Sequence, residues 1–189
     1  MPAPVLRGGV LPQFGEVPRG KGGAFRMTHF LGTHQNRLDA KGRVSVPAPF
    51  RAALKLRNGS SAPSEGAANA THLVLRPSHQ HPCIEAWPLA EFEALSAPLN
   101  RLDLFSPEHD DLAATLYSDA YPVETDKEGR IVLPDELKAH AGLADSVTFM
   151  GLGRIFQIWE PSAAESRRAE ARDRARSRGF TLPQGRSGV

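Results

Sequence analysis

The sequence of 189 residues contains a single cysteine, Cys83, and few aromatic residues, which make up 7% of it. One cysteine cannot form an internal disulfide, so we expect a reducing compartment, the cytoplasm. Because no run of about 18 apolar residues occurs, the sequence predicts no membrane-spanning helix and no membrane partner. Hydrophobic residues nevertheless make up 40% of the chain, which is ordinary for a soluble globular protein.

The first 26 residues also lack the continuous apolar stretch that a signal peptide requires. They contain six glycines and four prolines, so we expect a disordered N-terminal extension outside the fold. Met27 is an alternative translation start. Residues 57–71, "RNGSSAPSEGAANAT", are small and polar and predict a disordered loop.

Charge is distributed unevenly along the chain. Residues 1–26 have four basic residues against one acid, and residues 162–189 have seven arginines against three acids. Since the whole chain carries +2, residues 27–161 carry −5. One segment of this acidic body is basic, with a single acid, Asp39, among Arg37, Lys41, Arg43, Arg51, Lys55 and Arg57. DNA binding requires local positive charge, so the acidic body does not exclude it.

One pattern, Asp-x-x-Gly-Arg-x-x-x-Pro, occurs twice, offset by 87 positions. Its copies lie in "LDAKGRVSVPAPFRAAL" and "ETDKEGRIVLPDELKAHAGL". The turn residues of the two copies are Asp39, Gly42 and Arg43, and Asp126, Gly129 and Arg130. Aspartate can bond the backbone that follows it and glycine supplies positive φ, so each copy predicts a tight turn, typical of a hairpin, before a short strand. The proline then predicts the first turn of a helix.

Further strands are predicted near residues 73–75, 83–87, 121–124, 147–150 and 155–159, and further helices over residues 88–99, 106–118 and from residue 161. Each copy has about 45 residues, too few for a core of its own. We therefore expect an α+β fold, rich in β structure, in which the two copies form an intrachain pseudo-dimer. The expected divisions are repeat 1 (33–91), a helical connection (92–119), repeat 2 (120–163) and an Arg-rich C-terminal tail (164–189).

The two copies differ in the charges around their turns. Around the first turn we expect Arg37, Lys41 and Arg43 at the rim, with Arg51 on the following helix reaching the same side. Arginine's planar fork suits phosphate and guanine edges, so these four residues are the candidate DNA-binding group. The second copy places its three basic residues among five acids, which repel phosphate. There Asp126, Gly129 and Arg130, like Asp39 and Gly42, are expected to have a structural role in the turn.

The stretches "FLGTHQNRLDAKGRVSVPAPFRAAL" and "TDKEGRIVLPDELKAHAGL" resemble the two halves of the MraZ family of transcriptional regulators, over about residues 29–163. The resemblance implies two SpoVT-AbrB-like swapped-hairpin units in a cytoplasmic, nucleoid-associated protein that assembles into homo-oligomeric rings. It also implies binding of double-stranded DNA at promoter repeats of the division and cell-wall gene cluster, usually with repression. The family's DNA-contacting arginine falls on Arg43, with Arg37, Lys41 and Arg51 around it.

Other functions have weaker support. An antitoxin-like AbrB protein whose Arg-rich tail binds a protein partner remains an alternative. His79, His81 and Cys83 alternate, but the fourth ligand of a zinc site is missing. Gly151-Leu-Gly153 lacks the lysine of a phosphate loop and fits a hairpin turn. No nucleophile has a recognisable partner, so we expect no enzyme, cofactor, metal site or small-molecule substrate.

Overall fold

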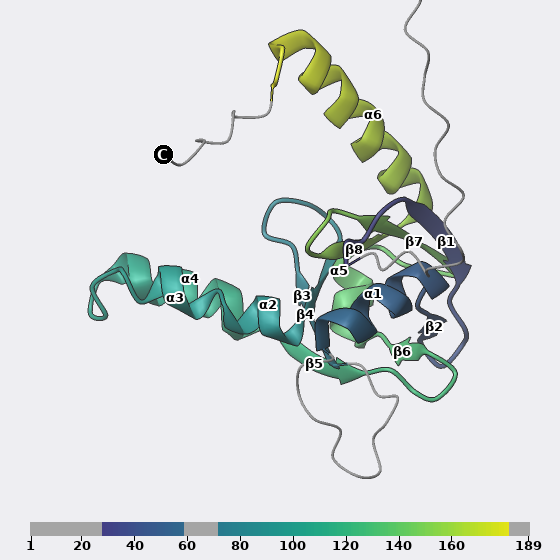
Figure 1. Cartoon of the computed structure of the whole chain (residues 1–189), viewed down its shortest axis with the longest axis horizontal. Coiled ribbons are helices and arrows are strands. Elements are labelled where there is room, and N and C mark those ends of the chain that lie inside the picture. Colours follow the sequence, from purple (N-terminus) through teal and green to yellow (C-terminus); the bar gives the residue numbers. More distant parts are fainter. Residues whose placement is uncertain (1–27, 59–71, 182–189) are drawn as a thin grey trace, which may run out of the picture.

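The computed structural model of the protein describes residues 28–58 and 72–181. The extension expected over residues 1–26 and most of the loop expected over residues 57–71 lie outside these ranges. Within the described ranges, no helix is long and apolar enough to cross a membrane. The predicted α+β class is confirmed, because an antiparallel six-stranded sheet and a two-stranded ribbon are combined with short helices (Figure 1).

The first copy of the pattern forms four strands and one helix. These elements are β1 (Thr33–Arg37), β2 (Arg43–Ser45), α1 (Ala48–Asn58), β3 (His72–Pro77) and β4 (Ile84–Pro88). α1 begins directly after Pro47 and buries Phe50, Ala53 and Leu54 completely. Their i, i+3, i+4 spacing places all three on the helix face that packs on the core.

The second copy repeats the same order of elements. They are β5 (Tyr121–Glu124), β6 (Arg130–Val132), α5 (Asp135–His140), β7 (Ser146–Gly151) and β8 (Phe156–Trp159). α5 starts after Pro134 and buries Leu137, and Gly142, with φ of +60°, follows its C-terminal end. The predicted hairpin over Gly151-Leu-Gly153 is confirmed, since β7 and β8 pair on either side of it.

The two copies exchange their first strands. The order in the large sheet is β1-β7-β8-β4-β3-β5, so β1 pairs with β7 of the second copy and β5 pairs with β3 of the first. β2 and β6 pair with each other in the separate ribbon. The hairpin expected between β1 and β2 is therefore reduced to one bridge, between Leu38 and Val44. The predicted intrachain pseudo-dimer is confirmed, because each copy completes the sheet of the other.

The larger of two hydrophobic clusters in the described part of the chain lies between the copies. The first copy contributes residues such as Phe30, Val44, Phe50, Leu54 and Ile84, and the second contributes residues such as Ile131, Leu137, Phe149, Phe156 and Ile158. All of these side chains are nearly or completely inaccessible to solvent. Neither copy could form this core alone, which is why the chain needs both.

An arm of three short helices leaves the sheet after β4 (Figure 1). It consists of α2 (Leu89–Glu93), α3 (Ser96–Leu99) and α4 (Pro107–Tyr117). The prediction of one helix over residues 88–99 is wrong, because the helix is interrupted between α2 and α3. Pro98 has no N–H, and in a continuous helix its ring would clash with the carbonyl of Ala94. α4 begins as predicted, with the Ser106 hydroxyl accepting a hydrogen bond from the His109 N–H at 3.1 Å.

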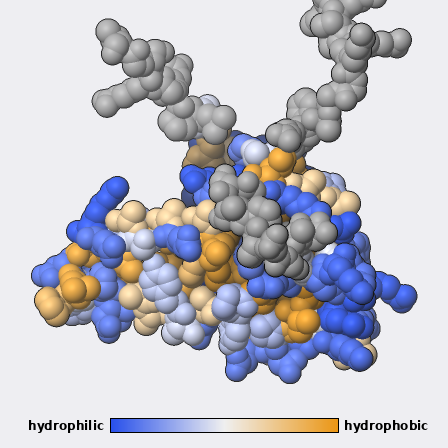
Figure 2. All heavy atoms as spheres, turned by 60° about the horizontal axis from the view of Figure 1, so that its bottom comes forward, coloured by the Kyte–Doolittle hydropathy of each residue, from blue (hydrophilic) through white to orange (hydrophobic). Residues whose placement is uncertain are grey.

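The arm carries exposed apolar side chains. Leu104 and Phe105, in the turn before α4, are 65% and 92% exposed, and Leu112 and Tyr117 on α4 are also exposed. Figure 2 shows apolar surface at the far end of the arm. A contiguous apolar surface on a projecting element is typical of a site of protein association.

The C-terminal segment is helical, as the sequence predicts. α6 (Pro161–Arg178) begins where the Glu160 carboxylate accepts the Ala163 N–H at 2.8 Å, and it ends at Gly179 with φ of +58°. Ala164 is its one buried residue, packed near Trp159. The helix therefore touches the sheet near its start and extends away from the body (Figure 1).

Candidate nucleic-acid interface

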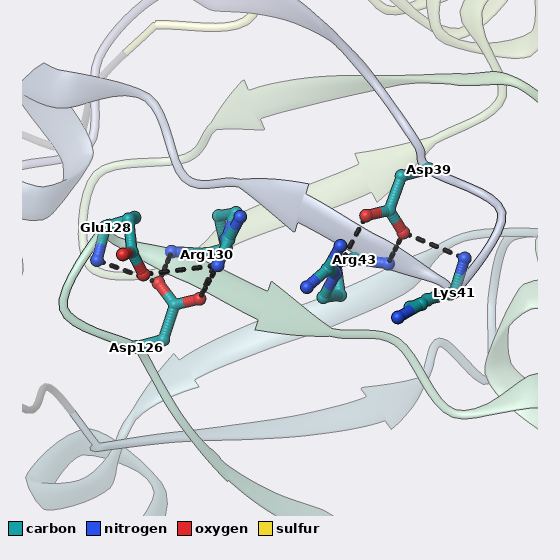
Figure 3. A network of polar contacts seen from close by, with 6 residues as sticks. All are labelled: Asp39, Lys41, Arg43, Asp126, Glu128 and Arg130. Carbon is teal, nitrogen blue, oxygen red and sulfur yellow. Dashed lines mark hydrogen bonds and ion pairs between the residues drawn. The ribbon is translucent and has the colours of Figure 1, made fainter.

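One carboxylate holds the first turn, residues 39–42. Asp39 Oδ1 accepts hydrogen bonds from the backbone N–H groups of Lys41 and Arg43, both at 2.9 Å. Asp39 Oδ2 accepts the Nε–H of Arg43 at 2.7 Å (Figure 3). Gly42 completes the turn with φ of +72°, which glycine adopts without a steric penalty. Asp39 thus fixes both the backbone of the turn and the direction of the Arg43 side chain.

The second turn, residues 126–129, has the same geometry. Asp126 Oδ1 accepts the backbone N–H groups of Glu128 at 3.0 Å and Arg130 at 2.8 Å. Asp126 Oδ2 accepts the Nε–H of Arg130 at 2.8 Å, and Gly129 has φ of +76°. Both turns are therefore closed by the same arrangement of an aspartate, a glycine and an arginine.

The ribbon of β2 and β6 places both arginines on one face. Arg43 lies opposite Val132, and Val44 lies opposite Ile131. Val44 and Ile131 are buried, so by strand alternation Arg43 and Arg130 project from the outward face. They are diagonal neighbours on this face, a relation that spans about 7–8 Å in antiparallel pairs. The two turns lie at opposite ends of the ribbon (Figure 3).

The two arginines differ in what holds their outer nitrogens. Arg130 Nη2 donates to Glu128 at 3.1 Å in addition to its bonds with Asp126, and these two acids raise the pKa of Arg130. Lys41 occupies the position that corresponds to Glu128. Among the described residues, no acceptor contacts the two Nη groups of Arg43. Arg43 is therefore oriented by one acid and keeps its outer fork open, whereas Arg130 is held by two.

The same hydrogen bonds lower the pKa values of the two aspartates. For Asp39 the largest cause is the backbone N–H of Arg43, with the Arg43 side chain adding to it. For Asp126 the largest cause is the backbone N–H of Arg130. A carboxylate that accepts several N–H groups is stabilised in its charged form. Because the folded-state pKa is lowered, the stabilisation is present above the unfolded-state pKa and is lost as pH falls through the folded-state pKa.

We expect an NMR titration of the carboxyl carbons to give midpoints for Asp39 and Asp126 below the ordinary value of 3.8. The stability that these turns contribute should then fall only under acidic conditions below that value. Arg43→Gln removes one bond and leaves the backbone N–H groups, so it should raise the midpoint of Asp39 only partly and leave Asp126 unchanged. A midpoint for Asp39 at or above 3.8 in the unsubstituted protein would contradict this account.

Arg51 does not lie where the sequence suggested. We expected it on the side of the first turn, but its side chain covers Gly129 of the second turn, and its Nη1 donates to the Val46 carbonyl at 2.6 Å. Strand exchange explains the correction, since α1 starts only after β2 has crossed the ribbon to the other end. The backbone repeats this arrangement, with the Val46 N–H donating to the Gly129 carbonyl at 3.0 Å.

The corresponding residue of the second copy, Lys138, covers Gly42 of the first turn. A Cβ on Gly42 would lie 3.1 Å from Lys138 Nζ, which also pairs with Asp135 at 2.6 Å. Sequence reasoning assigned Lys138 to the second copy and so missed a basic group at the first turn. The repeat itself carried the signal, because exchanged strands imply exchanged helices.

Arg37 ends β1 as an exposed side chain, two residues before the first turn. Its neighbour Asn36 donates from Nδ2 to the Ser45 carbonyl at 2.6 Å, which fastens β1 to the ribbon. Lys41 is exposed at the tip of the turn. Of the four candidates, the structure thus places Arg37, Lys41 and Arg43 around the first turn and Arg51 at the second.

The histidine and cysteine cluster has a structural explanation. Cys83 is buried and its pKa is raised to about 12, chiefly by burial, so its thiol is protonated and poorly reactive. Its neighbour His81 stacks on Trp159, with 5.7 Å between ring centroids. Over residues 28–58 and 72–181 no group of three or more histidine, cysteine or acidic side chains could hold a metal ion.

Comparison with known proteins identifies the family. The model of the family described as "MraZ protein, putative antitoxin-like" matches residues 29–114 and 116–177. A protein of Gluconacetobacter diazotrophicus named transcriptional regulator MraZ is 67% identical over 161 residues, which cover 85% of this chain and 96% of that protein. Proteins of the same name are 58% identical in Gluconobacter oxydans, over 80% of this chain and 87% of theirs, and 41% identical in Azorhizobium caulinodans, over 84% and 94%. The chain, with its two exchanged copies of one strand-turn-strand-helix pattern, belongs to the MraZ family.

Proposed function

We propose that this protein is a DNA-binding transcriptional regulator and that the outward face of the β2–β6 ribbon contacts the DNA through Arg43. The relatives' shared name, transcriptional regulator MraZ, supports the regulatory role. That role is not enzymatic, which agrees with the expectation that the chain is not an enzyme. A DNA-binding regulator would act in the cytoplasm, at the nucleoid.

The observation that carries the proposal is the open guanidinium fork of Arg43. A two-stranded β-ribbon fits the major groove of B-DNA, where arginine can donate two hydrogen bonds to one guanine. Asp39 orients Arg43 through Nε and leaves both Nη groups without an acceptor among the described residues. Lys41 and Arg37, both exposed beside the turn, would contact the phosphates. Arg51 has a different part in the proposal, since it supports the second turn of the same ribbon.

The proposal includes how the protein assembles and which DNA it binds. The chain would form a ring-like homo-oligomer that binds repeated sites in the promoter of the division and cell-wall gene cluster and represses it. Several ribbons on one ring could engage tandem repeats together, which converts weak single contacts into tight binding. The exposed apolar side chains of the arm, Leu104 and Phe105 above all, support self-association. DNase footprinting on the upstream region of the protein's own gene, together with its mass in solution, tests both parts.

Arg43→Ala should weaken binding of a promoter fragment by about ten- to hundredfold at each site, because a bidentate arginine–guanine contact contributes about 1–3 kcal/mol. The measurement is a fluorescence anisotropy titration at several salt concentrations. Wild-type affinity should fall steeply with salt, as several phosphate contacts require. Lys41→Ala should instead reduce the salt slope by about one unit and weaken all sequences alike.

Arg130→Ala is the matched control for Arg43→Ala. It removes an arginine from the same ribbon face and the same turn geometry, but one whose fork is already held by Asp126 and Glu128. We expect it to change DNA affinity by less than about threefold, in keeping with a loss of general positive charge alone. Equal losses for the two variants, or no loss for Arg43→Ala at moderate salt, would sink the assignment of Arg43.

A second candidate function rests on α6. The matching family description includes the words "antitoxin-like", and α6 carries most of its arginines on exposed positions, as a segment that binds an acidic partner would. In this reading the tail captures a protein partner while the ribbon still binds DNA. Removing residues 172–189 should then abolish complex formation with a purified partner protein and leave promoter affinity intact. Loss of promoter affinity on the same deletion would count against it.

A further inference from the structure

A cavity of about 520 Å³ lies between α6 and the sheet, away from the β2–β6 ribbon, which contributes no residue to it. Its size is within the range of small-molecule sites. Part of the lining is apolar. It consists of Met150 on β7, Leu152 and Ile155 in the turn between β7 and β8, and Ala171 on α6. The remainder is polar and comes from β1, β4, β8, α6 and the connection between β3 and β4.

The charges around this cavity are mostly positive. α6 lines it with Arg167, Arg168 and Arg172, whereas among the described lining residues Glu85 is the one acid. The Glu85 carboxylate is already engaged, because it accepts the Trp87 indole N–H at 3.2 Å and lies 3.3 Å from Nε of the buried Arg76. The three arginines of α6 therefore face a cavity with one acid in its lining, and that acid has other partners.

Arg167 shows the imbalance most clearly. Its Nε and Nη1 atoms are buried, and neither has a hydrogen-bond partner in the described part of the chain. Buried guanidinium N–H groups without acceptors are rare, and each such group calls for an explanation. His81, beside it, cannot supply a negative charge, and its pKa is lowered first by burial and then by the charges of Arg167 and Arg174, which outweigh the opposing charges of Glu85 and Glu170. A negatively charged group in the cavity would offset this excess of positive charge.

We propose that this cavity is a binding site for a small organic anion, a phosphate monoester or a carboxylate with an apolar body. Arg167 would hold the anionic group through its guanidinium, whose charge-assisted N–H donors suit the oxygens of either group. Gln80 and Gln157 line the same space and offer amide N–H groups. The apolar body would lie on Met150, Leu152 and Ile155.

The test is isothermal titration calorimetry of the full chain with four probes, at low salt. Phenyl phosphate and inorganic phosphate represent one source of the anionic group, and benzoate represents the other. Benzamide is the uncharged counterpart of benzoate. We expect saturable binding of phenyl phosphate or benzoate at about 0.1–1 mM, an ordinary affinity for a ligand of this size. The stronger of the two identifies the anionic group, and benzamide should not bind measurably.

Variants on α6 locate the site. Arg167→Met keeps an unbranched stem, removes the guanidinium with its charge and should weaken binding by at least about tenfold, since it deletes the charge-assisted hydrogen bonds to the anion. Arg176→Met is the matched control, from an exposed arginine of the same helix outside the cavity, and should change affinity by less than about twofold. Ala171→Phe fills the cavity without changing its charge and should also abolish binding, and far-UV circular dichroism verifies that each variant is folded.

A second readout is the titration of the His81 imidazole by NMR. A bound anion beside Arg167 offsets the positive charge that lowers the pKa of His81, so the midpoint should rise in the presence of the stronger ligand. The proposal is overturned if no probe saturates by about 10 mM, if benzamide binds as tightly as benzoate, or if Arg176→Met weakens binding as much as Arg167→Met. It is also overturned if a DNA duplex displaces the probe and Arg167→Met weakens DNA binding equally. Arg43→Ala should leave anion binding unchanged, so the two proposals fail independently.

Discussion

Replacing Phe50 by alanine is expected to lower the free energy of unfolding by about 3–5 kcal/mol, the usual cost of deleting a buried aromatic ring. Phe50 is completely buried in α1 of the first copy. Its ring centroid lies 5.3 Å from that of Phe30 and 5.1 Å from that of Phe156 of the second copy, and the Phe149 ring lies 6.4 Å away. The substitution therefore removes the side chain that joins the two halves of the core.

Urea unfolding followed by circular dichroism measures this effect as a shift of the midpoint. Phe180→Ala is the control, because Phe180 is 65% exposed beyond the end of α6 and its removal should change stability by less than about 0.5 kcal/mol. Because both copies share one core, the Phe50→Ala variant should still unfold in a single transition. Two separate transitions, one for each copy, would contradict a shared core.

The local structure of each copy could be predicted from sequence, because it depends on residues close together in the chain. Asp39 and Gly42 define a turn by their own backbone chemistry, and the same holds for Asp126 and Gly129. The spacing of Phe50, Ala53 and Leu54 identified the buried face of a helix. The pseudo-dimer also followed from a physical argument, since a unit of about 45 residues cannot enclose a core.

The exchange of strands between the copies could not be predicted from local patterns. An antiparallel ladder does not depend on which copy supplies the second strand, so the pairing of β2 with β6 has no local signature. For this reason the sequence placed Arg51 at the first turn, whereas it lies on Gly129 of the second. The interruption of the helix at Ala94, in contrast, could have been predicted. Pro98 stands in the sequence, and its ring would clash with the preceding helical turn.

The difference in charge between the two copies could be predicted from the sequence. The structure shows that the two differently charged turns belong to one ribbon. Lys41 and Glu128 occupy corresponding positions, and Glu128 gives Arg130 a second acidic partner, whereas Arg43 has Asp39 alone among the described residues. Both arginines nevertheless share the outward face of one ribbon. The difference between the copies is therefore in how far each arginine is already engaged, within one continuous surface.

Gly129→Ala is expected to lower the free energy of unfolding by about 2–3 kcal/mol. An alanine at φ of +76° is strained by about 1–2 kcal/mol, and the hydrogen bond that Arg51 makes with Val46 adds about 1 kcal/mol if it is lost. The second loss follows because the new Cβ would lie 2.3 Å from Arg51 Cδ, so the arginine must leave its place. Gly42→Ala has a similar φ of +72°, but its Cβ would lie 3.1 Å from Lys138 Nζ, the end of a flexible side chain, and 3.3 Å from the Leu133 carbonyl oxygen, so each neighbour needs only a small shift. It should cost little more than the strain, about 1–2 kcal/mol.

The difference between the two glycines can be assigned to Arg51 by a double-mutant cycle. Once Arg51→Ala has removed the side chain, Gly129→Ala has no arginine to displace, so the double variant should lose less stability than the sum of the two single variants. The coupling should be about 1 kcal/mol at Gly129, because that is the hydrogen bond counted twice in the sum. The same cycle with Gly42→Ala should be additive, since Arg51 does not touch that turn. Additivity at both glycines would mean that Arg51 does not brace the second turn, and the exchange of helices between the two turns would then have no energetic consequence.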